Sequence, residues 1–397
     1  MKKRQDNTYY EIPASPRIIS GDTALEVLGE EMRSHGATNV LLITDAVSDK
    51  SELADRLRIA LTATGLRPGA NYVAKRDVAS YSAVYELREL YRINVCDGII
   101  ACGGEATIGT AKALRMLLSS QEADLDSIAG VDIAKKKMTI PFAAVPSGID
   151  TSSGVTMNAY LKKENGEGRE FRAVSGCADI CAVDIETGED VNAVSTIKGA
   201  ALVLSDSIEA FVSVNARKLT KCMDLFAIRA IRDSLDRALN APSDRAAYWQ
   251  LRQAGILSGL ACNVAGAGLA RALENALAVV CGGSREDYVG IVLPAVLAFN
   301  IDACAADYAQ ALYYLIGDDS YAMTAAEERA RKLVDVVKEL FERLAKEAGL
   351  PLKLSEIVDD ETKLEAVANV ALGDYALMTD PAAVTAKDVA DILRSIW

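Results

Sequence analysis

The stretch Asp97–Leu118, DGIIACGGEATIGTAKALRMLL, combines residue types that can bind an anion. Its apolar run Ile99–Ala101 predicts a strand, Gly103 and Gly104 predict a turn, and apolar residues at helical spacing from Thr107 onward predict a helix. Glycines at such a turn let backbone N–H groups approach an anion, and the helix N-terminus favours negative charge. A nucleotide phosphate is the default ligand, although a glycine pair that serves only tight packing explains this stretch equally well.

Two further stretches place polar side chains after predicted strands. The buried run Val40–Thr44 ends at Asp45, whose carboxylate could accept hydrogen bonds from a ribose diol or cap the following helix. The loop Pro146–Thr156, PSGIDTSSGVT, follows a strand predicted over Thr139–Val145 and is dense in hydroxyl groups. It could bind phosphate or ribose, or it could be a plain polar loop.

The composition excludes several kinds of site. A formal net charge of −13 argues against non-specific binding to nucleic acid or to an anionic membrane. The one histidine, His35, ends a predicted helix in a polar stretch, so the chain cannot build a multi-histidine metal site. Eight cysteines without a C-x-x-C pair predict reduced core thiols. With no signal peptide and an apolar run, Val289–Ile301, too short to span a bilayer, we expect a cytoplasmic protein.

The periodicity of the sequence changes near residue 190, from alternating strands and helices to helices alone. Strands are predicted over Pro16–Ser20, Val40–Thr44, Asn71–Val73, Ile99–Ala101, Thr139–Val145 and Cys181–Asp184, with a hairpin formed by Asn158–Leu161 and Glu170–Val174. Helices are predicted over Val194–Val214, Lys221–Leu239, Ala246–Leu260, Gly266–Val280, Val289–Phe299, Asp302–Leu315, Ala325–Ala348, Thr362–Val370 and Ala386–Ile396. The predicted fold class is α/β + α: a Rossmann-like nucleotide-binding domain over 1–188 and an all-helical domain over 189–397, with the ligand in the cleft between them.

The chain resembles the iron-containing (group III) alcohol dehydrogenase family and, more distantly, its dehydroquinate synthase-like relatives. The family turn G-G-G-S-x-x-D-x-x-K matches Gly103–Lys112, and the family loop P-T-T-A-G-T-x-x-E-V-T matches Pro146–Thr156. The family helix D-A-L-x-H-A-I-E-A-Y matches Leu202–Phe211, and Gly259–Asn300 matches the last two site helices without a gap. The order and spacing of these pieces make the resemblance specific.

The resemblance implies a divalent metal held by one Asp and three His, but the matching places carry Leu202, Asp206, Arg271 and Arg285. Leucine offers no donor atom, arginine is always protonated, and one carboxylate does not hold Fe²⁺ or Zn²⁺ alone. We therefore expect no metal at this place. A further family histidine, near the substrate, matches Asn275.

The residues that replace the metal ligands allow two interpretations. Arg271 and Arg285 beside Asp206 could polarise a carbonyl group or hold a substrate carboxylate in two-point contact. Alternatively, Asp206 forms a structural ion pair with one of the arginines. Lys198, in the same predicted helix, could donate a proton if it is buried, or remain a solvated surface residue.

The nucleotide side is altered as well. Glu105 replaces the third glycine of the family turn, and its carboxylate would repel a pyrophosphate unless it points away. Gly109 replaces an Asp and Gly148 a Thr. The family residues that remain are Asp45, Gly103, Gly104, Thr151 and Lys112. The candidate cofactor contacts are Asp45, Gly103, Gly104, Thr151 and Asn158. Asp45 matches a family acid that suits the free ribose of NAD.

The leading hypothesis is a metal-independent NAD(H)-dependent oxidoreductase that acts on the carbonyl or alcohol of a small anionic substrate, bearing a carboxylate or phosphate. Its candidate catalytic residues are Asp206, Arg271, Asn275, Arg285 and Lys198. One alternative is a dehydroquinate synthase-like lyase, cyclase or isomerase that uses a bound nucleotide. Another is a non-catalytic homologue whose eroded site binds a ligand or partner. By resemblance we expect a homodimer formed through the N-terminal strands.

Overall fold

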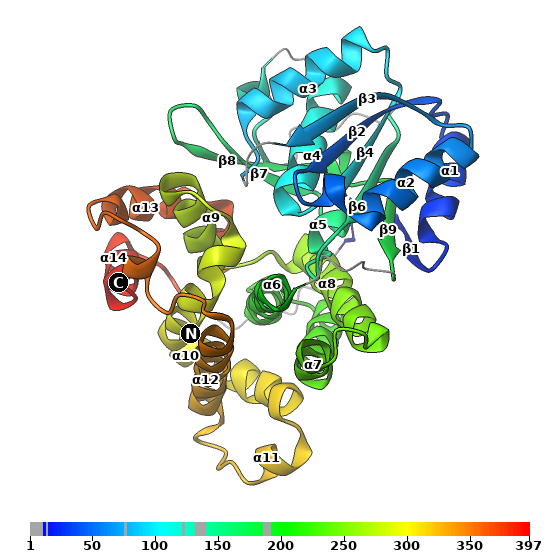
Figure 1. Cartoon of the computed structure of the whole chain (residues 1–397). Coiled ribbons are helices and arrows are strands. Elements are labelled where there is room, and N and C mark those ends of the chain that lie inside the picture. The colour runs from blue at the N-terminus through cyan, green and yellow to red at the C-terminus, as the bar shows by residue number, and fades with distance from the viewer. Residues whose placement is uncertain (1–10, 13–14, 75–77, 121–123, 132–139, 186–191) are drawn as a thin grey trace.

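A six-stranded parallel sheet forms the centre of the N-terminal part of the chain (Figure 1). The computed structural model describes residues 11–12, 15–74, 78–120, 124–131, 140–185 and 192–397. In spatial order the strands are β1 (Arg17–Gly21), β9 (Ile180–Asp184), β6 (Phe142–Pro146), β4 (Gly98–Gly103), β2 (Asn39–Asp45) and β3 (Arg67–Ala74). The central strands are buried on both faces, which explains why they appear in the sequence as continuous apolar runs.

Helices cover both faces of this sheet. Leu28 of α1 (Ala24–Ser34) and Leu57 of α2 (Glu52–Ala63) belong to a core that packs on one face. Val84 of α3 (Tyr81–Ile93) and Leu114 of α4 (Glu105–Ser119) belong to a core on the other face. The layers therefore form a doubly wound α/β fold, in which ligands bind at the carboxyl ends of the strands.

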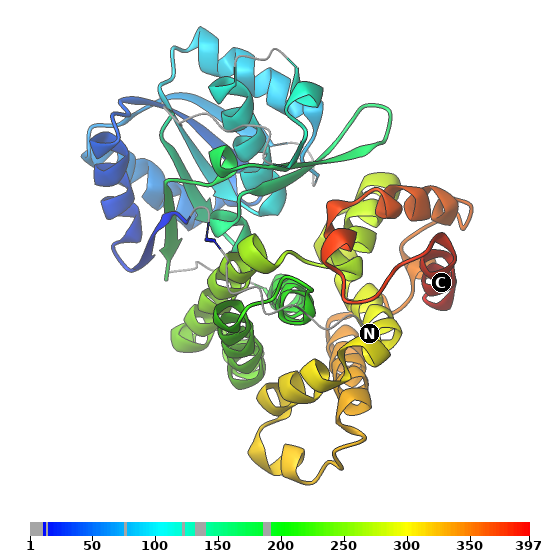
Figure 2. The same ribbon diagram turned by 180° about the vertical axis from the view of Figure 1, so that it is seen from behind.

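A second, three-stranded sheet lies beside the main one. It pairs β5 (Gly130–Val131), β8 (Gly168–Arg172) and β7 (Asn158–Lys162), with β7 and β8 antiparallel as a hairpin. The hairpin projects from the α/β part toward the helical part in both opposite views (Figure 2). It therefore forms one wall of the space between the two parts.

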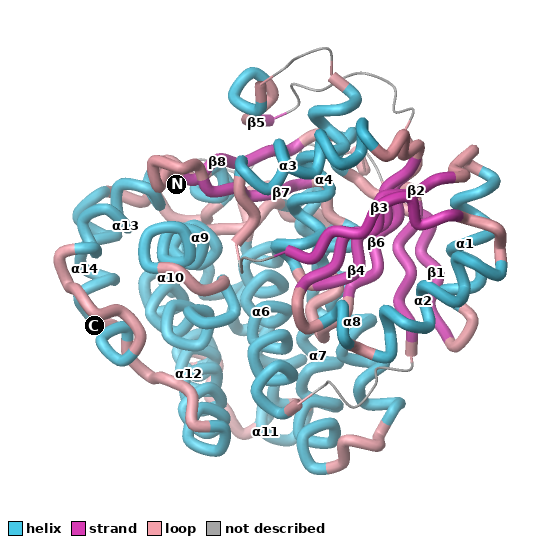
Figure 3. The backbone as a smooth tube through the Cα atoms, turned by 45° about the horizontal axis from the view of Figure 1, so that its top comes forward, coloured by secondary structure: helices cyan, strands magenta, loops and turns pink. Residues whose placement is uncertain are grey.

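Every named element among the described residues from 192 onward is helical (Figure 3). These helices are α6 (Ala193–Val212), α7 (Lys218–Asn240), α8 (Arg245–Ala265), α9 (Leu269–Cys281), α10 (Arg285–Ile316), α11 (Asp318–Ala322), α12 (Arg329–Ala348), α13 (Lys363–Leu372) and α14 (Ala386–Ser395), with the 3₁₀ turns η4 (Leu354–Glu356) and η5 (Tyr375–Thr379). Their apolar faces share one large core. Between α8 and α9 the chain bends by 104° at Gly266, whose φ of +80° lies in the left-handed region.

The α/β and helical parts meet where α8 packs on α5 (Ser152–Val155), a short helix within the polar loop that follows β6. Arg252 of α8 is buried and donates hydrogen bonds to the carbonyl oxygens of Pro146, Gly148 and Asp184. The junction is therefore fixed by backbone contacts at the ends of β6 and β9.

The predicted fold class is confirmed, with local corrections. The two helices predicted over Val289–Phe299 and Asp302–Leu315 form the single α10, which is interrupted only by non-helical dihedral angles at Cys304. The sequence prediction missed α5 and α11. The predicted strand start at Thr139 and the domain boundary at 188/189 lie outside the described residues.

One detail of side-chain placement also differs from expectation. All eight cysteines are free thiols, yet Cys222 is exposed on α7 rather than in the core.

By length and composition, α10 among the described helices could cross a membrane, as could the bent pair α8–α9 taken together. Since Tyr288 and Leu312 of α10 lie in the helical core, this is weak evidence for a span.

Candidate functional site

A cavity of about 540 Å³ lies between the α/β part and the helical part. Its lining includes Asp45, Gly104, Lys112, Gly148, Asp150, Asn158, Asn275 and Glu286. The first five come from the carboxyl ends of β2, β4 and β6 and the segments that follow them, Asn158 begins β7, and the last two come from α9 and α10. The volume is within the range of small-molecule and cofactor sites.

The N-terminus of α4 opens onto this cavity. Gly104 is the N-cap of α4, and a Cβ atom added there would meet no atom within 4 Å. Asp45 holds the turn, because one carboxylate oxygen accepts from the Ser48 N–H at 2.7 Å and the other from the Gly104 N–H at 3.1 Å. The capping role predicted for Asp45 is wrong, because the N-cap of the following helix α2 is Ser51, whose side chain accepts from the Ala54 N–H. Asp45 instead joins two turns at the strand ends and borders the cavity.

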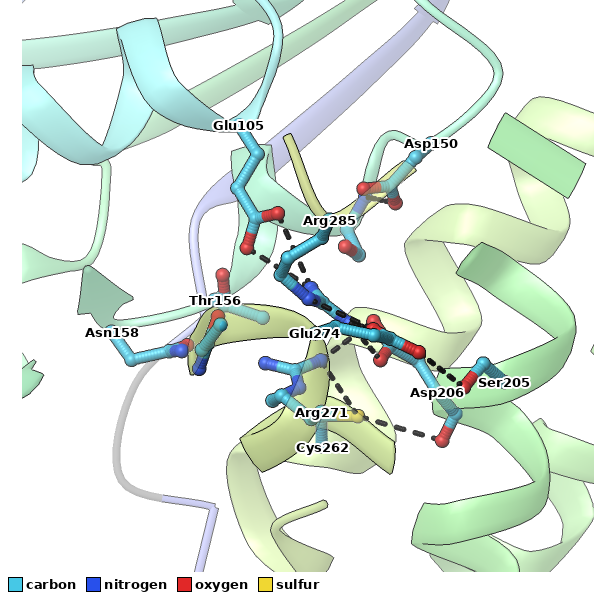
Figure 4. Close-up of polar contacts among 12 residues, drawn as sticks. Glu105, Asp150, Thr156, Asn158, Ser205, Asp206, Cys262, Arg271, Glu274 and Arg285 are labelled. Carbon is cyan, nitrogen blue, oxygen red and sulfur yellow. Dashed lines mark hydrogen bonds and ion pairs between the residues drawn. The ribbon is translucent and has the colours of Figure 1, made fainter. Parts of the chain in front are cut away.

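A cluster of two arginines and three carboxylates lies beside the cavity (Figure 4). We call these residues, Glu105, Asp206, Arg271, Glu274 and Arg285, the ion-pair cluster. Asp206 pairs with Arg271 at 2.6 Å and with Arg285 at 2.9 Å. Arg285 also pairs with Glu274 at 2.8 Å and with both carboxylate oxygens of Glu105, at 3.1 and 3.2 Å. The cluster therefore joins α4 of the α/β part to α6, α9 and α10 of the helical part.

Neighbouring helices hold the two arginines in place. Glu209 of α6 accepts hydrogen bonds from the Ala270 and Arg271 backbone N–H groups at the start of α9. Asp380 accepts from the Leu269 N–H at 2.8 Å. A Cβ atom on Gly268 would lie 2.8 Å from both of these carboxylates, so a residue without a side chain is needed there. These contacts fix the start of α9, from which Arg271 projects toward Asp206.

The electrostatics of the ion-pair cluster follow from burial and pairing. Burial would raise the pKa of Asp206, but Arg271 and Arg285 hold that pKa below its usual range. Burial raises the pKa of Glu274 to about 7, against the effect of Arg285. Burial, with the charges on Glu105 and Asp206, raises the pKa of nearby Asp150 to about 6. Both guanidiniums thus already have carboxylate partners within the protein.

The donor set at the family's metal place does not fit a divalent cation. Leu202 is fully buried and has no donor atom, while Arg271 and Arg285 bring positive charge to the positions of two ligands. Within the described ranges, no group of three or more His, Cys, Asp or Glu side chains is arranged to hold a metal ion.

The structure brings together three of the five candidate catalytic residues, namely Asp206, Arg271 and Arg285. The alternative interpretation expected Asp206 to form an ion pair with one arginine. In the structure Asp206 forms ion pairs with both Arg271 and Arg285. Asn275 borders the cavity and donates to Asp374 at 2.9 Å. Lys198 lies apart, paired with Asp287 at 2.5 Å.

Three of the five candidate cofactor contacts border the cavity, namely Asp45, Gly104 and Asn158. Gly103 does not border it but packs against the Asp45 carboxylate. Thr151 is fully buried, and its hydroxyl donates to the Arg252 carbonyl oxygen at 2.6 Å. Thr151 therefore packs the junction between the two parts instead of bordering the cavity.

Three further side chains matter in this region, of which sequence reasoning missed Glu274 altogether. Glu274 completes the cluster, and Glu105, which is expected to disfavour a pyrophosphate unless it points away, points across to Arg285. Lys112, which the sequence identifies only as a retained residue of the family turn, borders the cavity while almost fully buried. Glu274 and Lys112 have a visible signal, because each is one of only two charges in an otherwise largely apolar helical stretch, LARALENALAVV with Arg271 and TAKALRMLL with Arg115. A buried charge in such a stretch requires a partner or a function.

Two family models match the chain and together cover most of it. Residues 15–185 match iron-containing alcohol dehydrogenase, and residues 196–397 match the C-terminal part of the Fe-containing alcohol dehydrogenase family. The chain belongs to the iron-containing alcohol dehydrogenase family. Its departure from the family's ligand set at Leu202, Arg271 and Arg285 is therefore a change within a known oxidoreductase fold.

Similar proteins extend over almost the whole chain. The NAD-dependent methanol dehydrogenase of Bacillus methanolicus is 24% identical over 382 residues, which cover 96% of this chain and 98% of that protein. The lactaldehyde reductase of Escherichia coli strain K12 is 22% identical over 380 residues, 95% of this chain and 97% of that one. An alcohol dehydrogenase from Oenococcus oeni superposes with a TM-score of 0.90 at 20% identity, covering 98% of this chain and 100% of the other.

Proposed function

We propose that this protein is an NAD(H)-dependent oxidoreductase that interconverts a small alcohol and its aldehyde or ketone without a divalent metal. The observation that carries the proposal is the ion-pair cluster, which places the Arg285 guanidinium among Asp206, Glu274 and Glu105 where the family's metal is expected. A protein cation thus occupies that place, next to a cavity that the N-terminus of α4 borders. Full-length similarity to NAD-dependent dehydrogenases supports NAD as the cofactor.

The residues around the cavity fit a dinucleotide. Backbone N–H groups at the start of α4 favour a pyrophosphate, and Gly104 leaves room for it. Asp45 lies at the strand end where a ribose hydroxyl would bind. When bound, NAD would supply the hydride acceptor or donor. The obstacle foreseen at Glu105 is reduced, because this carboxylate pairs with Arg285.

We propose a neutral substrate in place of the anionic one that the sequence suggested. Arg285 uses Nε, Nη1 and Nη2 to bind Glu274, Glu105 and Asp206. A substrate carboxylate would have to displace one of these protein carboxylates. Asp150 and Glu286 also border the cavity and would repel an anion. A short alcohol or aldehyde avoids both costs.

A calorimetric titration with NADH, on protein whose metal content has been measured, tests this function together with a screen of short alcohols and NAD⁺. We expect micromolar NADH binding and turnover without bound metal. Gly104→Val should fold normally and lose NADH affinity, because its side chain would enter the phosphate site. Gly290→Ala on α10, where a Cβ atom also has room, is the matched control and should bind as wild type. If wild type binds no NADH at millimolar concentration, the protein is a non-catalytic homologue.

A further inference from the structure

The proposed oxidation of an alcohol releases a proton, and the residues first considered for accepting it are badly placed. Asp206 is completely buried with both carboxylate oxygens on guanidinium groups, and it does not border the cavity. Lys198 is paired with Asp287. Asn275 borders the cavity, but an amide does not titrate, and His35 is exposed at the end of α1. The reaction needs another proton acceptor.

Lys112 has the position and the surroundings of such a group. It is 1% exposed and borders the cavity from α4. Its Nζ donates to the Thr156 hydroxyl at 2.9 Å and to the Asn158 carbonyl oxygen at 3.1 Å. These two bonds leave the third direction of Nζ for a further partner. Among the described residues, no carboxylate forms an ion pair with Lys112.

The charged and titratable groups that face Lys112 come from several elements. Glu105 lies on the same helix, Cys177 follows the 3₁₀ turn η3 (Val174–Gly176), Cys181 lies on β9, and Arg271 approaches from α9. Burial, with a smaller contribution from Arg271, lowers the pKa of Lys112 to about 8, against the opposing effect of Glu105 and the thiols. A lysine with neither a carboxylate partner nor contact with bulk water is the kind that exchanges a proton near neutral pH.

The location along α4 also suits chemistry at the far end of a dinucleotide. Lys112 lies eight residues after Gly104, which is roughly 12 Å along a helix. The phosphate-binding turn and Lys112 therefore border one cavity at two separated points, and Asn275 of α9 borders it from the helical part. A dinucleotide anchored at the turn has room to extend toward Lys112.

We propose that Lys112 is the catalytic residue that accepts the hydroxyl proton of the alcohol substrate, an assignment that rests on the proposed oxidoreductase function. The C–H bond electrons leave with the hydride for oxidised NAD, and the O–H bond electrons form the second carbon–oxygen bond. The proton bonds to the neutral Nζ of Lys112, and the ammonium returns it to water after the product leaves. In carbonyl reduction the protonated Lys112 donates the same proton.

The test compares wild type with Lys112→Met, Lys112→Arg and the control Lys162→Met. Lys162 on β7 also donates to a backbone carbonyl, that of Val279, but it does not border the cavity. For wild type and Lys162→Met we expect the rate of alcohol oxidation to rise with pH, with a midpoint near 8. Both Lys112 variants should lose roughly 100-fold or more in kcat together with that rise, while NADH affinity stays within about threefold. Arginine retains the positive charge and hydrogen bonds but does not accept a proton, so a purely structural role predicts an active Lys112→Arg.

A rescue experiment adds a readout that a structural role does not produce. In Lys112→Ala, ethylamine should restore alcohol oxidation in proportion to its free-base concentration, and Lys162→Ala should show no such response.

A Lys112→Met enzyme that keeps its rate or its pH dependence overturns the assignment. If no Lys112 variant folds, the wild-type profile decides, since a midpoint between pH 5 and 7 would indicate a carboxylic acid instead. A wild-type chain without turnover overturns the proposed function and this assignment together, whereas an active wild type with active Lys112 variants overturns this assignment alone.

Discussion

At the scale of single residues, Asp206 is the centre of the ion-pair cluster because it binds both guanidinium groups from a completely buried position. Asp206→Asn keeps the shape of the side chain but removes the negative charge that pairs with the buried guanidinium groups of Arg271 and Arg285. We expect the free energy of unfolding to fall by about 3–5 kcal/mol, the cost of breaking a buried pair. Urea unfolding at pH 7 measures this difference.

Asp233 provides the matched control for this variant. It also pairs with two arginines, Arg229 at 3.2 Å and Arg232 at 2.7 Å, but its side chain is 44% exposed. Asp233→Asn should therefore change the free energy of unfolding by only about 0–1 kcal/mol. Equal effects of the two substitutions would show that the ion-pair cluster does not stabilise the fold.

Asp224 of α7 makes a separate prediction, on pH. It is fully buried, neither carboxylate oxygen accepts a hydrogen bond from a described residue, and burial raises its pKa well above the usual range. The native state then holds a proton that the unfolded state releases, so stability falls as pH rises between the two pKa values, by up to about 1.4 kcal/mol per pH unit. Asp224→Asn should be more stable than wild type, with a larger gain at pH 8 than at pH 5. Thermal unfolding across this range checks it, and a gain that is independent of pH would refute it.

At the scale of elements, the N-terminus of α4 carries both the turn that we propose to bind the nucleotide and Glu105, whose side chain is 40% exposed. Glu105→Gln keeps a hydrogen-bonding group for Arg285 and removes one negative charge beside the phosphate site. We expect NADH to bind roughly threefold to tenfold more tightly, with a smaller gain at high salt. Glu52→Gln, at the first position of α2 and away from the cavity, is the control. Weaker NADH binding by Glu105→Gln would mean that this carboxylate is needed to hold Arg285.

The elements themselves were largely predictable from the sequence, and their contacts were not. Buried parallel strands such as β2 and β4 appear as continuous apolar runs, so the doubly wound sheet and its order of elements follow from pattern alone. The resemblance then located Asp206, Arg271 and Arg285 in one place. It did not reveal that Glu274 and Glu105 complete their pairing. The contact of Glu274 depends on how α9 packs against α10, and the contact of Glu105 depends on how the two parts of the chain are docked. The same limit applies to Lys112: the resemblance identified it as part of the family turn, but its burial and its partners Thr156 and Asn158 depend on β7 and the loop before it.

At the scale of the whole molecule, the cavity exists only while the α/β and helical parts keep their relative position, and Arg252 is one of the residues that hold them together. It is 1% exposed, and its guanidinium binds the carbonyl oxygens of Gly148 at 3.1 Å, Pro146 at 2.6 Å and Asp184. Arg252→Met would leave these carbonyls without their donors. We expect a loss of about 3 kcal/mol or more in the free energy of unfolding, and weaker NADH binding because Gly148 borders the cavity.

Arg245 lies on the same helix and also joins the two parts, through Asp22 at 2.8 Å, but both side chains are more than half exposed. Arg245→Met should therefore change stability by no more than about 1 kcal/mol and leave NADH binding unchanged. Differential scanning calorimetry of both variants, with an NADH titration of each, separates the two cases. If Arg252→Met loses stability yet binds NADH as wild type does, the cavity does not depend on this junction. If it unfolds in two steps, the buried guanidinium is what makes the two parts unfold as one.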